Sequence, residues 1–339
     1  MNPVKVNYEG WRPEVLNPLL IDPSSNSFRA GIGDLAQVLG ELVDTTEGVS
    51  LVVPVDLAEA VRLRQPDVPF SSQRGSGTVG ARTMPVGDGQ IDVIVDANFL
   101  IANDAAGLAA ASAGRPILNR DGLSLVRRTI VHEAQHVVMN QRGSSFEDYL
   151  PERVDGEARA HLFDVARLMC DEHRAESKAT QLTTPDPPSV DDVLDVLCHL
   201  GQELQAADAL YQSAPGRHGA VGKLRDDVYI ACGSFWTAVS YWAAQYRRED
   251  EIAEPSESIQ TLGVWQRYVG PIWGTMAAAL SAVPVIDLST TKQDLHAAAM
   301  GVLVAVEKSL SFIGFRYFDD GANGPAFYVD RHDFPSARA

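Results

Sequence analysis

Cysteine is scarce in this sequence, and its placement argues against a disulfide framework. The 339 residues include three cysteines, Cys170, Cys198 and Cys232, which lie far apart and form no CxxC pair. An odd number of widely spaced cysteines is atypical of a disulfide scaffold or a cysteine zinc site. Each lies in an apolar stretch with helical periodicity, so we predict three buried thiols.

The sequence also shows neither the pattern of a secretory signal nor a long apolar run. Residues 1–10 do not show the basic-then-apolar order of a secretory signal, and no window is a continuous apolar segment long enough to cross a bilayer. We therefore expect a cytoplasmic protein that does not associate with a membrane.

Basic residues are too few to balance the acidic ones. The 28 Lys and Arg stand against 45 Asp and Glu, which gives a formal net charge of -17. Nucleic-acid affinity depends on cationic side chains that release phosphate counterions, and anionic membranes attract the same side chains. Nucleic acid and anionic membrane are thus disfavoured partners, and the charge is typical of a surface that keeps a protein soluble.

The N-terminal part of the chain mixes helical and strand patterns. Apolar residues recur at helical spacing over 35–43, and the β-branched run 49–55 is typical of a buried strand. Residues 91–96 alternate apolar and acidic side chains, which we interpret as a half-buried edge strand. These patterns predict an α+β fold with a small mixed sheet.

Helical periodicity dominates from residue 121 onward. Asp121 is the expected N-cap of a helix that ends near Gly143, and Asp155 is the expected N-cap of a second helix reaching about Lys178. The segment 183–189 is rich in proline and cannot continue a helix. We interpret it as the seam between two domains, 1–182 and 190–339.

The second domain is predicted to be mainly α-helical and to complete the cleft of the first. Its sequence shows helical periodicity over 190–211, 224–246, 259–280 and 291–312. The chain then ends in a predicted hairpin of 315–318 with 327–329.

Two histidines four residues apart are the strongest chemical signal in the sequence. His132 and His136 belong to the segment His132-Glu133-Ala134-Gln135-His136, inside the first predicted helix. Positions i and i+4 of a helix face the same way, so both imidazoles can bind one ion, while Glu133 projects about 100° around the axis. The spacing predicts a zinc-type site with Glu133 as its general base.

The sequence offers three candidates for the third metal ligand of this site. Catalytic zinc takes three protein ligands and one water, and Glu157 is our first choice because two His and one Glu are an established set. Asp155 and His161 are the alternatives, one as the expected N-cap and the other four residues after Glu157. A third histidine six residues after His136 is absent, because Arg142 occupies that position.

Over about 91–179 the chain resembles the HExxH zinc metallopeptidases of the zincin fold, in the glutamate-ligand branch that includes thermolysin-like enzymes. The strand 91–95, the HExxH helix and Glu157 follow one another in the family's order. The resemblance implies a zincin-like domain in which His132, His136 and Glu157 bind zinc. It also implies that Glu133 activates a metal-bound water to cleave a peptide or amide bond.

One residue departs from the family's pattern, and the residue that would stabilise the oxyanion is not identified. His161 stands where the family often has an Asp that supports a metal histidine. No motif singles out Tyr149, His218 or Tyr268 as the residue that stabilises the oxyanion.

Two further functions share the motif. Two His and one carboxylate also bind Fe²⁺ in non-heme oxygenases, and around the motif the chain is similar to HExxH-type peptide-modifying hydroxylases that depend on 2-oxoglutarate. An inactive zincin-like binding protein is the third hypothesis, against which the presence of Glu133 counts. The expected partner is a peptide or protein, and the sequence leaves its identity and the oligomeric state open.

Overall fold

The computed structural model divides the chain into two compact units. It describes residues 4–28, 31–67, 70–101, 110, 113, 119–145, 148, 154–249, 251–286, 290–321 and 324–336. The first unit, here called the sheet unit, comprises Met1–Arg74, Thr78–Gly143 and Gln181–Thr183. The second, the helical unit, comprises Gly75–Gly77, Ser144–Thr180 and Thr184–Ala339. The predicted α+β class is confirmed, but the main division falls at Gly143 and not in the proline-rich segment 183–189.

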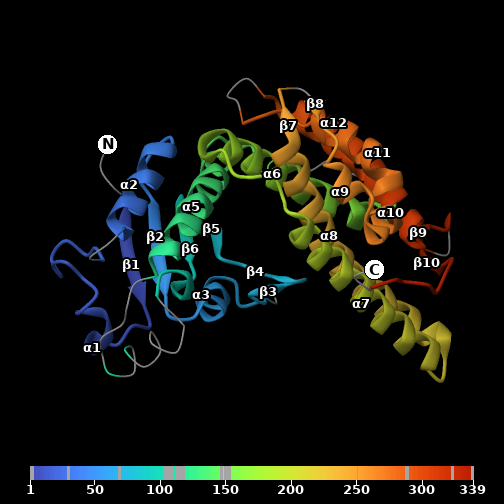
Figure 1. Ribbon diagram of the computed structural model, residues 1–339, viewed down its shortest axis with the longest axis horizontal. Helices are drawn as coiled ribbons and strands as arrows, with labels where there is room; N and C mark the ends of the chain where they lie inside the picture. The colour runs from blue at the N-terminus through green and yellow to red at the C-terminus, as the bar shows by residue number, and fades with distance from the viewer. Residues whose placement is uncertain are drawn as a thin grey trace. The chain divides into compact units, whose positions relative to one another are not determined.

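The sheet unit is built on a four-stranded mixed sheet, whose place among the helices can be followed in Figure 1. The strands β1 (Lys5–Glu9), β2 (Val49–Pro54), β6 (Gln90–Val95) and β5 (Ala81–Gly87) follow one another in that order. The first three are parallel and β5 is antiparallel. The interior strand β2 is apolar almost throughout, as a strand with both faces covered has to be.

Helices cover both faces of this sheet. On one face α2 (Ile32–Leu42) and α5 (Arg120–Gln141) share an apolar core with alternate residues of β2 and β6. On the other face α3 (Leu57–Arg64) packs on Val52, Met84 and Ile94. The α5 helix, which carries the two histidines, is thereby fixed against the sheet.

The predicted edge strand is an interior strand, which corrects the interpretation of 91–96. β6 pairs with β2 on one side and with β5 on the other, so β5 is the edge. The acidic residues that suggested exposure have other roles. Asp92 accepts a hydrogen bond from Arg64 Nε at 2.7 Å, and Asp96 is the buried N-cap of a short 3-10 helix (Ala97–Phe99).

The two predicted helices around the motif exist, with different N-caps. The N-cap of α5 is Asn119, whose side chain accepts from Gly122 N at 3.0 Å, and Asp121 lies inside the helix. The helix ends before Gly143, whose positive φ of 59° is typical of a helix C-terminus. α6 (Glu157–Thr183) follows Gly156 and continues beyond the predicted end at Lys178.

The N-terminus of α6 is capped from a distant strand. Asp155, the predicted N-cap, is exposed and makes no cap. The carboxylate of Asp319 on β9 instead accepts from Ala158 N at 3.1 Å and from Arg159 N at 3.4 Å. Gly156 adopts a φ of 92°, and a Cβ on it would collide with this carboxylate, so the cap requires glycine there.

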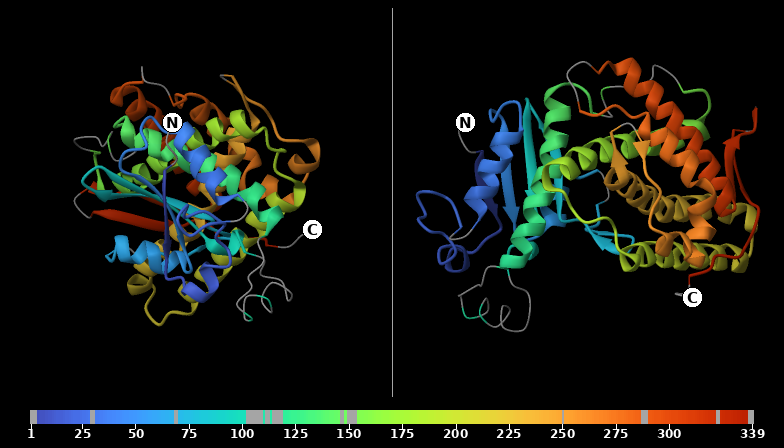
Figure 2. Two further views of the ribbon diagram at one scale, coloured as in Figure 1. Left: turned by 90° about the vertical axis from the view of Figure 1, so that its left-hand side faces the viewer. Right: turned by 45° about the horizontal axis from the view of Figure 1, so that its top comes forward.

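The helical unit contains the helices predicted after residue 190, with one exception. α7 (Val190–Ser213), α8 (Arg217–Tyr246) and α12 (Lys292–Ile313) agree with the periodicity, and α7 and α8 run side by side (Figure 2). The predicted helix 259–280 is instead three helices, α9 (Glu257–Gln260), α10 (Gly263–Tyr268) and α11 (Gly270–Ser281). Its breaks coincide with Gly263 and with the Gly270-Pro271 pair, which interrupt helical hydrogen bonding.

The remaining elements are short. The predicted C-terminal hairpin is confirmed as the antiparallel pair β9 (Phe315–Asp319) and β10 (Pro325–Val329). Others are α1 (Pro13–Leu16), β3 (Gln73–Arg74), β4 (Gly77–Thr78), β7 (Arg247–Arg248) and β8 (Glu251–Ile252).

The core of the helical unit holds the cysteines and the most apolar helix. Cys170, Cys198 and Cys232 are free and buried, as predicted. Within the described residues, α12 alone has the length and hydropathy of a membrane-spanning helix, with a mean hydropathy of 1.3 over 18 residues. Half of that window is buried, and core helices share these properties.

Candidate metal centre

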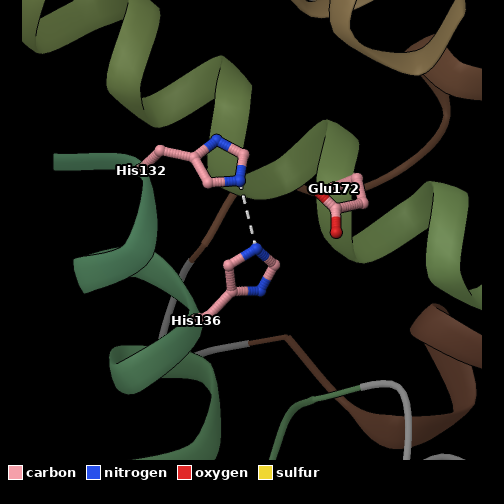
Figure 3. A group of neighbouring side chains, drawn as sticks. All are labelled: His132, His136 and Glu172. Atoms are coloured by element: carbon pink, nitrogen blue, oxygen red, sulfur yellow. Dashed lines mark hydrogen bonds between the residues drawn. The ribbon is translucent and has the colours of Figure 1, made fainter. Parts of the chain in front are cut away.

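The two motif histidines converge on one face of α5. The Nε2 atoms of His132 and His136 are 3.2 Å apart, and their ring centroids are 5.0 Å apart (Figure 3). His132 is buried and His136 is half-buried. Both imidazoles therefore present the same nitrogen to the same point.

This separation fits a shared metal ion. Zinc binds imidazole nitrogen at ~2.0 to 2.1 Å with tetrahedral angles, which places two nitrogen ligands ~3.3 to 3.4 Å apart. The observed 3.2 Å is close to that value. Without a metal, a hydrogen bond between the rings requires one of them to carry its proton on Nε2.

Glu133 is held on the sheet side of the same helix. Its carboxylate oxygen Oε2 accepts a hydrogen bond from the Thr83 hydroxyl at 2.7 Å, and the same hydroxyl lies 3.1 Å from the Glu133 carbonyl oxygen. Thr83 belongs to β5, the edge strand, and Glu133 itself is buried. The carboxylate predicted to act as the base thus has a fixed partner.

A third metal-ligand group comes from α6. Ligand atoms of His132, His136 and Glu172 all lie within 4.8 Å of one another (Figure 3). The carboxylate of Glu172 accepts a hydrogen bond from the Tyr241 hydroxyl at 2.6 Å, which orients it. Two imidazoles and one carboxylate are a donor set that suits a catalytic zinc ion, so these residues could hold a metal.

The three residues predicted for the third ligand lie elsewhere on or near α6. Glu157 is exposed at the first position of the helix, and 15 residues of helix separate it from Glu172 by ~22 Å along the axis. His161 is exposed, with Nδ1 2.8 Å from the Tyr317 hydroxyl, and Asp155 is exposed before the helix. We therefore propose Glu172 as the third metal ligand, whereas the sequence analysis predicted Glu157.

No family model, curated protein or solved structure matches this chain. Any function proposed for it therefore rests on the residues and geometry of the site itself.

Around Glu172, α6 carries a dense group of buried polar residues that join it to α8 and its extension. Glu176 accepts a hydrogen bond from Gln245 Nε2 at 2.8 Å. His173 donates from Nδ1 to the Ser240 carbonyl at 3.1 Å, and its Nε2 accepts from Arg247 at 3.1 Å. Complete burial lowers the pKa of His173 to about 3, so this imidazole is neutral, and both of its nitrogens are engaged within the fold.

Of the three candidates for stabilising an oxyanion, Tyr268 is the one whose side chain the structure describes. Tyr268 is fully buried, and its hydroxyl donates to the Pro335 carbonyl at 2.9 Å. Burial also raises its pKa. Tyr149 and the side chain of His218 lie outside the described residues.

Sequence reasoning missed three residues that bear on the site: Thr83, Glu172 and Tyr241. One signal pointed toward Glu172, because four ionisable side chains stand together in the segment Asp171-Glu172-His173-Arg174, inside a predicted helix. Such clusters in a buried helix are often functional. Thr83 and Tyr241 carry no comparable signal, since each is the ordinary residue for its strand or helix.

Proposed function

We propose that this protein is a zinc-dependent hydrolase of peptide or amide bonds, with His132, His136 and Glu172 as metal ligands and Glu133 as general base. The observation that carries the proposal is the convergence of two Nε2 atoms at 3.2 Å on the helix that also bears Glu133. Bound zinc supplies Lewis acidity, which polarises a carbonyl and makes water a stronger acid.

The proton transfers are assigned to Glu133, which Thr83 supports. The Glu133 carboxylate takes the proton of the attacking water and returns it to the nitrogen of the leaving amine, so that one water and one amide give an acid and an amine. Burial of Glu133 limits its exchange with bulk solvent, and the Thr83 hydroxyl fixes one of its oxygens.

The edge strand supports an extended peptide as substrate. β5 is the terminal strand of the sheet, and within the described residues it pairs with β6 alone among the named strands. An exposed strand edge can bind an extended peptide through main-chain hydrogen bonds. Since Thr83 links β5 to Glu133, a peptide bound along this edge would lie near the base.

The proposal is tested by metal analysis together with a single substitution. We expect about one zinc per chain after native purification and cleavage of fluorescein-labelled casein by the zinc-loaded protein. Glu133→Gln should retain the zinc and lose cleavage by at least about a hundredfold, because the amide keeps the shape but cannot take the proton. His132→Ala should lose both.

Two outcomes would replace the proposal by one of the alternatives. Iron recovered with the protein, together with turnover of 2-oxoglutarate that disappears in His136→Ala, would indicate a hydroxylase, because the same donor set suits Fe²⁺. Bound metal without hydrolysis or oxygenation of any tested peptide would favour a binding protein.

A further inference from the structure

The hydroxyl of Thr83 is placed on the side of the sheet that faces the motif helix. Thr83 pairs with Val93 in the β5–β6 ladder, and Val93 belongs to the core shared with α5. Its neighbours Arg82 and Met84 point to the opposite face, because side chains alternate along a strand. Met84 accordingly packs in the cluster with α3.

The contact with Glu133 is directional. The Thr83 hydroxyl has one proton to donate, and it lies 2.7 Å from the carboxylate oxygen and 3.1 Å from the carbonyl oxygen of the same residue. An ionised oxygen is the stronger acceptor and forms the shorter bond, so the proton belongs to the carboxylate. Ala134 and Val137, which lie beside Glu133 on α5, are fully buried and apolar.

We propose that Thr83 is a positioning residue for the base: its hydroxyl holds one oxygen of Glu133 and leaves the other to take the proton. This role rests on the proposed function of Glu133. A displacement of about 1 Å at a catalytic group can cost on the order of a hundredfold in rate, whereas substrate binding does not depend on that group's exact orientation. The loss of the hydroxyl should therefore lower kcat and leave KM and zinc content unchanged.

Three variants separate this role from a structural one. Thr83→Val keeps the side-chain shape and β-branching without the hydroxyl, and Thr83→Ser keeps the hydroxyl. Thr129→Val makes the same chemical change on α5, where the hydroxyl donates to the Leu125 carbonyl at 3.0 Å. Each would be assayed with a quenched-fluorescent peptide spanning a cleavage site mapped in casein, beside its zinc stoichiometry and a crystal structure.

We expect Thr83→Val to lower kcat about tenfold to a hundredfold. Its KM should be unchanged, and the crystal structure should show the Glu133 carboxylate rotated. Thr83→Ser should restore kcat and the carboxylate orientation, and Thr129→Val should match wild type. If Thr83→Val does not fold, Thr83→Ala against Thr83→Ser makes the same comparison.

The failure of this inference differs from the failure of the proposed function. An active wild type with unaltered kcat in Thr83→Val would overturn the role of Thr83 alone, as would a Glu133 carboxylate that keeps its orientation in that variant. Zinc-loaded wild type without hydrolytic activity would overturn the proposed function and, with it, the catalytic meaning of the Thr83 contact.

Discussion

The Tyr241 hydroxyl is the residue-scale feature that most directly predicts metal affinity. It donates to Glu172 at 2.6 Å, and partners of this kind fix a ligand's orientation. Tyr241→Phe should weaken zinc binding about tenfold to a hundredfold, as measured by competition with a chromophoric chelator. Tyr246→Phe on the same helix is the control and should bind zinc like wild type.

The identity of the third ligand is decided by two parallel substitutions. Glu172→Gln should weaken zinc binding by more than about a hundredfold, because it removes the charge of a direct ligand, whereas Glu157→Gln at the exposed start of α6 should have no effect. Competition titrations of both variants would measure this. The reverse pattern would restore the sequence prediction and remove Glu172 from the site.

The residues that sequence could and could not predict differ in how local their signal is. The grouping of His132, Glu133 and His136 could be predicted, because the relative positions of residues within about one helical turn depend only on helix geometry. Glu172 depends on which of several acidic residues of a long helix comes to the histidines, and that is set by tertiary packing. The nearest acidic residues after the motif helix were preferred for their position in the sequence, which carries no such information.

At the scale of elements, the cap of α6 predicts a measurable loss of stability. Asp319 accepts from the amides of Ala158 and Arg159, which have no partner within the helix. Asp319→Ala should lower the free energy of unfolding by about 1 kcal/mol, as measured by urea denaturation. Asp319→Asn keeps a side-chain acceptor and should lose much less; equal losses in both would show that the cap contributes nothing.

Elements whose signal is local were predicted well, and the errors have tertiary causes. The α7 helix begins at Val190, as the helical periodicity predicts, and the structure shows a capping box of Ser189 and Asp192 at its start; α12 begins with the same kind of cap at Thr291 and Asp294. β6 was mistaken for an edge strand because Asp92 is paired with Arg64, far away in sequence, and because Asp96 caps the short helix that follows the strand. A pattern of alternating polarity does not show whether an acidic side chain faces solvent or forms an ion pair within the fold.

At the scale of the whole molecule, metal binding should be visible in thermal stability. A ligand that binds the folded state alone stabilises it by about 2.7 kcal/mol at a free concentration one hundred times its Kd. Zinc at that level should raise the melting temperature by roughly 4 °C relative to the protein in EDTA. His136→Ala should melt at the same temperature in both conditions, and an equal zinc shift in that variant would place the stabilising ion elsewhere.

The division of the chain was harder to predict than its elements. The proline-rich segment 183–189 is a valid signal for the end of a helix, and α6 does end at Thr183. A helix end is not a domain boundary, however, and residues 144–180 belong with the helical unit. The whole apolar surface of α6 decides which neighbours it packs against. A local break in the sequence does not predict those neighbours.

Because all three cysteines are buried in the helical unit, the rate at which they react with a thiol reagent measures how fast this unit opens. Cys170, Cys198 and Cys232 lie on α6, α7 and α8, and burial raises the pKa of the Cys170 and Cys232 thiols. A maleimide reacts with thiolates that solvent can reach, so the native protein should label only as fast as these helices separate. The sheet unit contributes no thiol, and counting labelled sulfurs over time would therefore follow the unfolding of one unit while circular dichroism follows both.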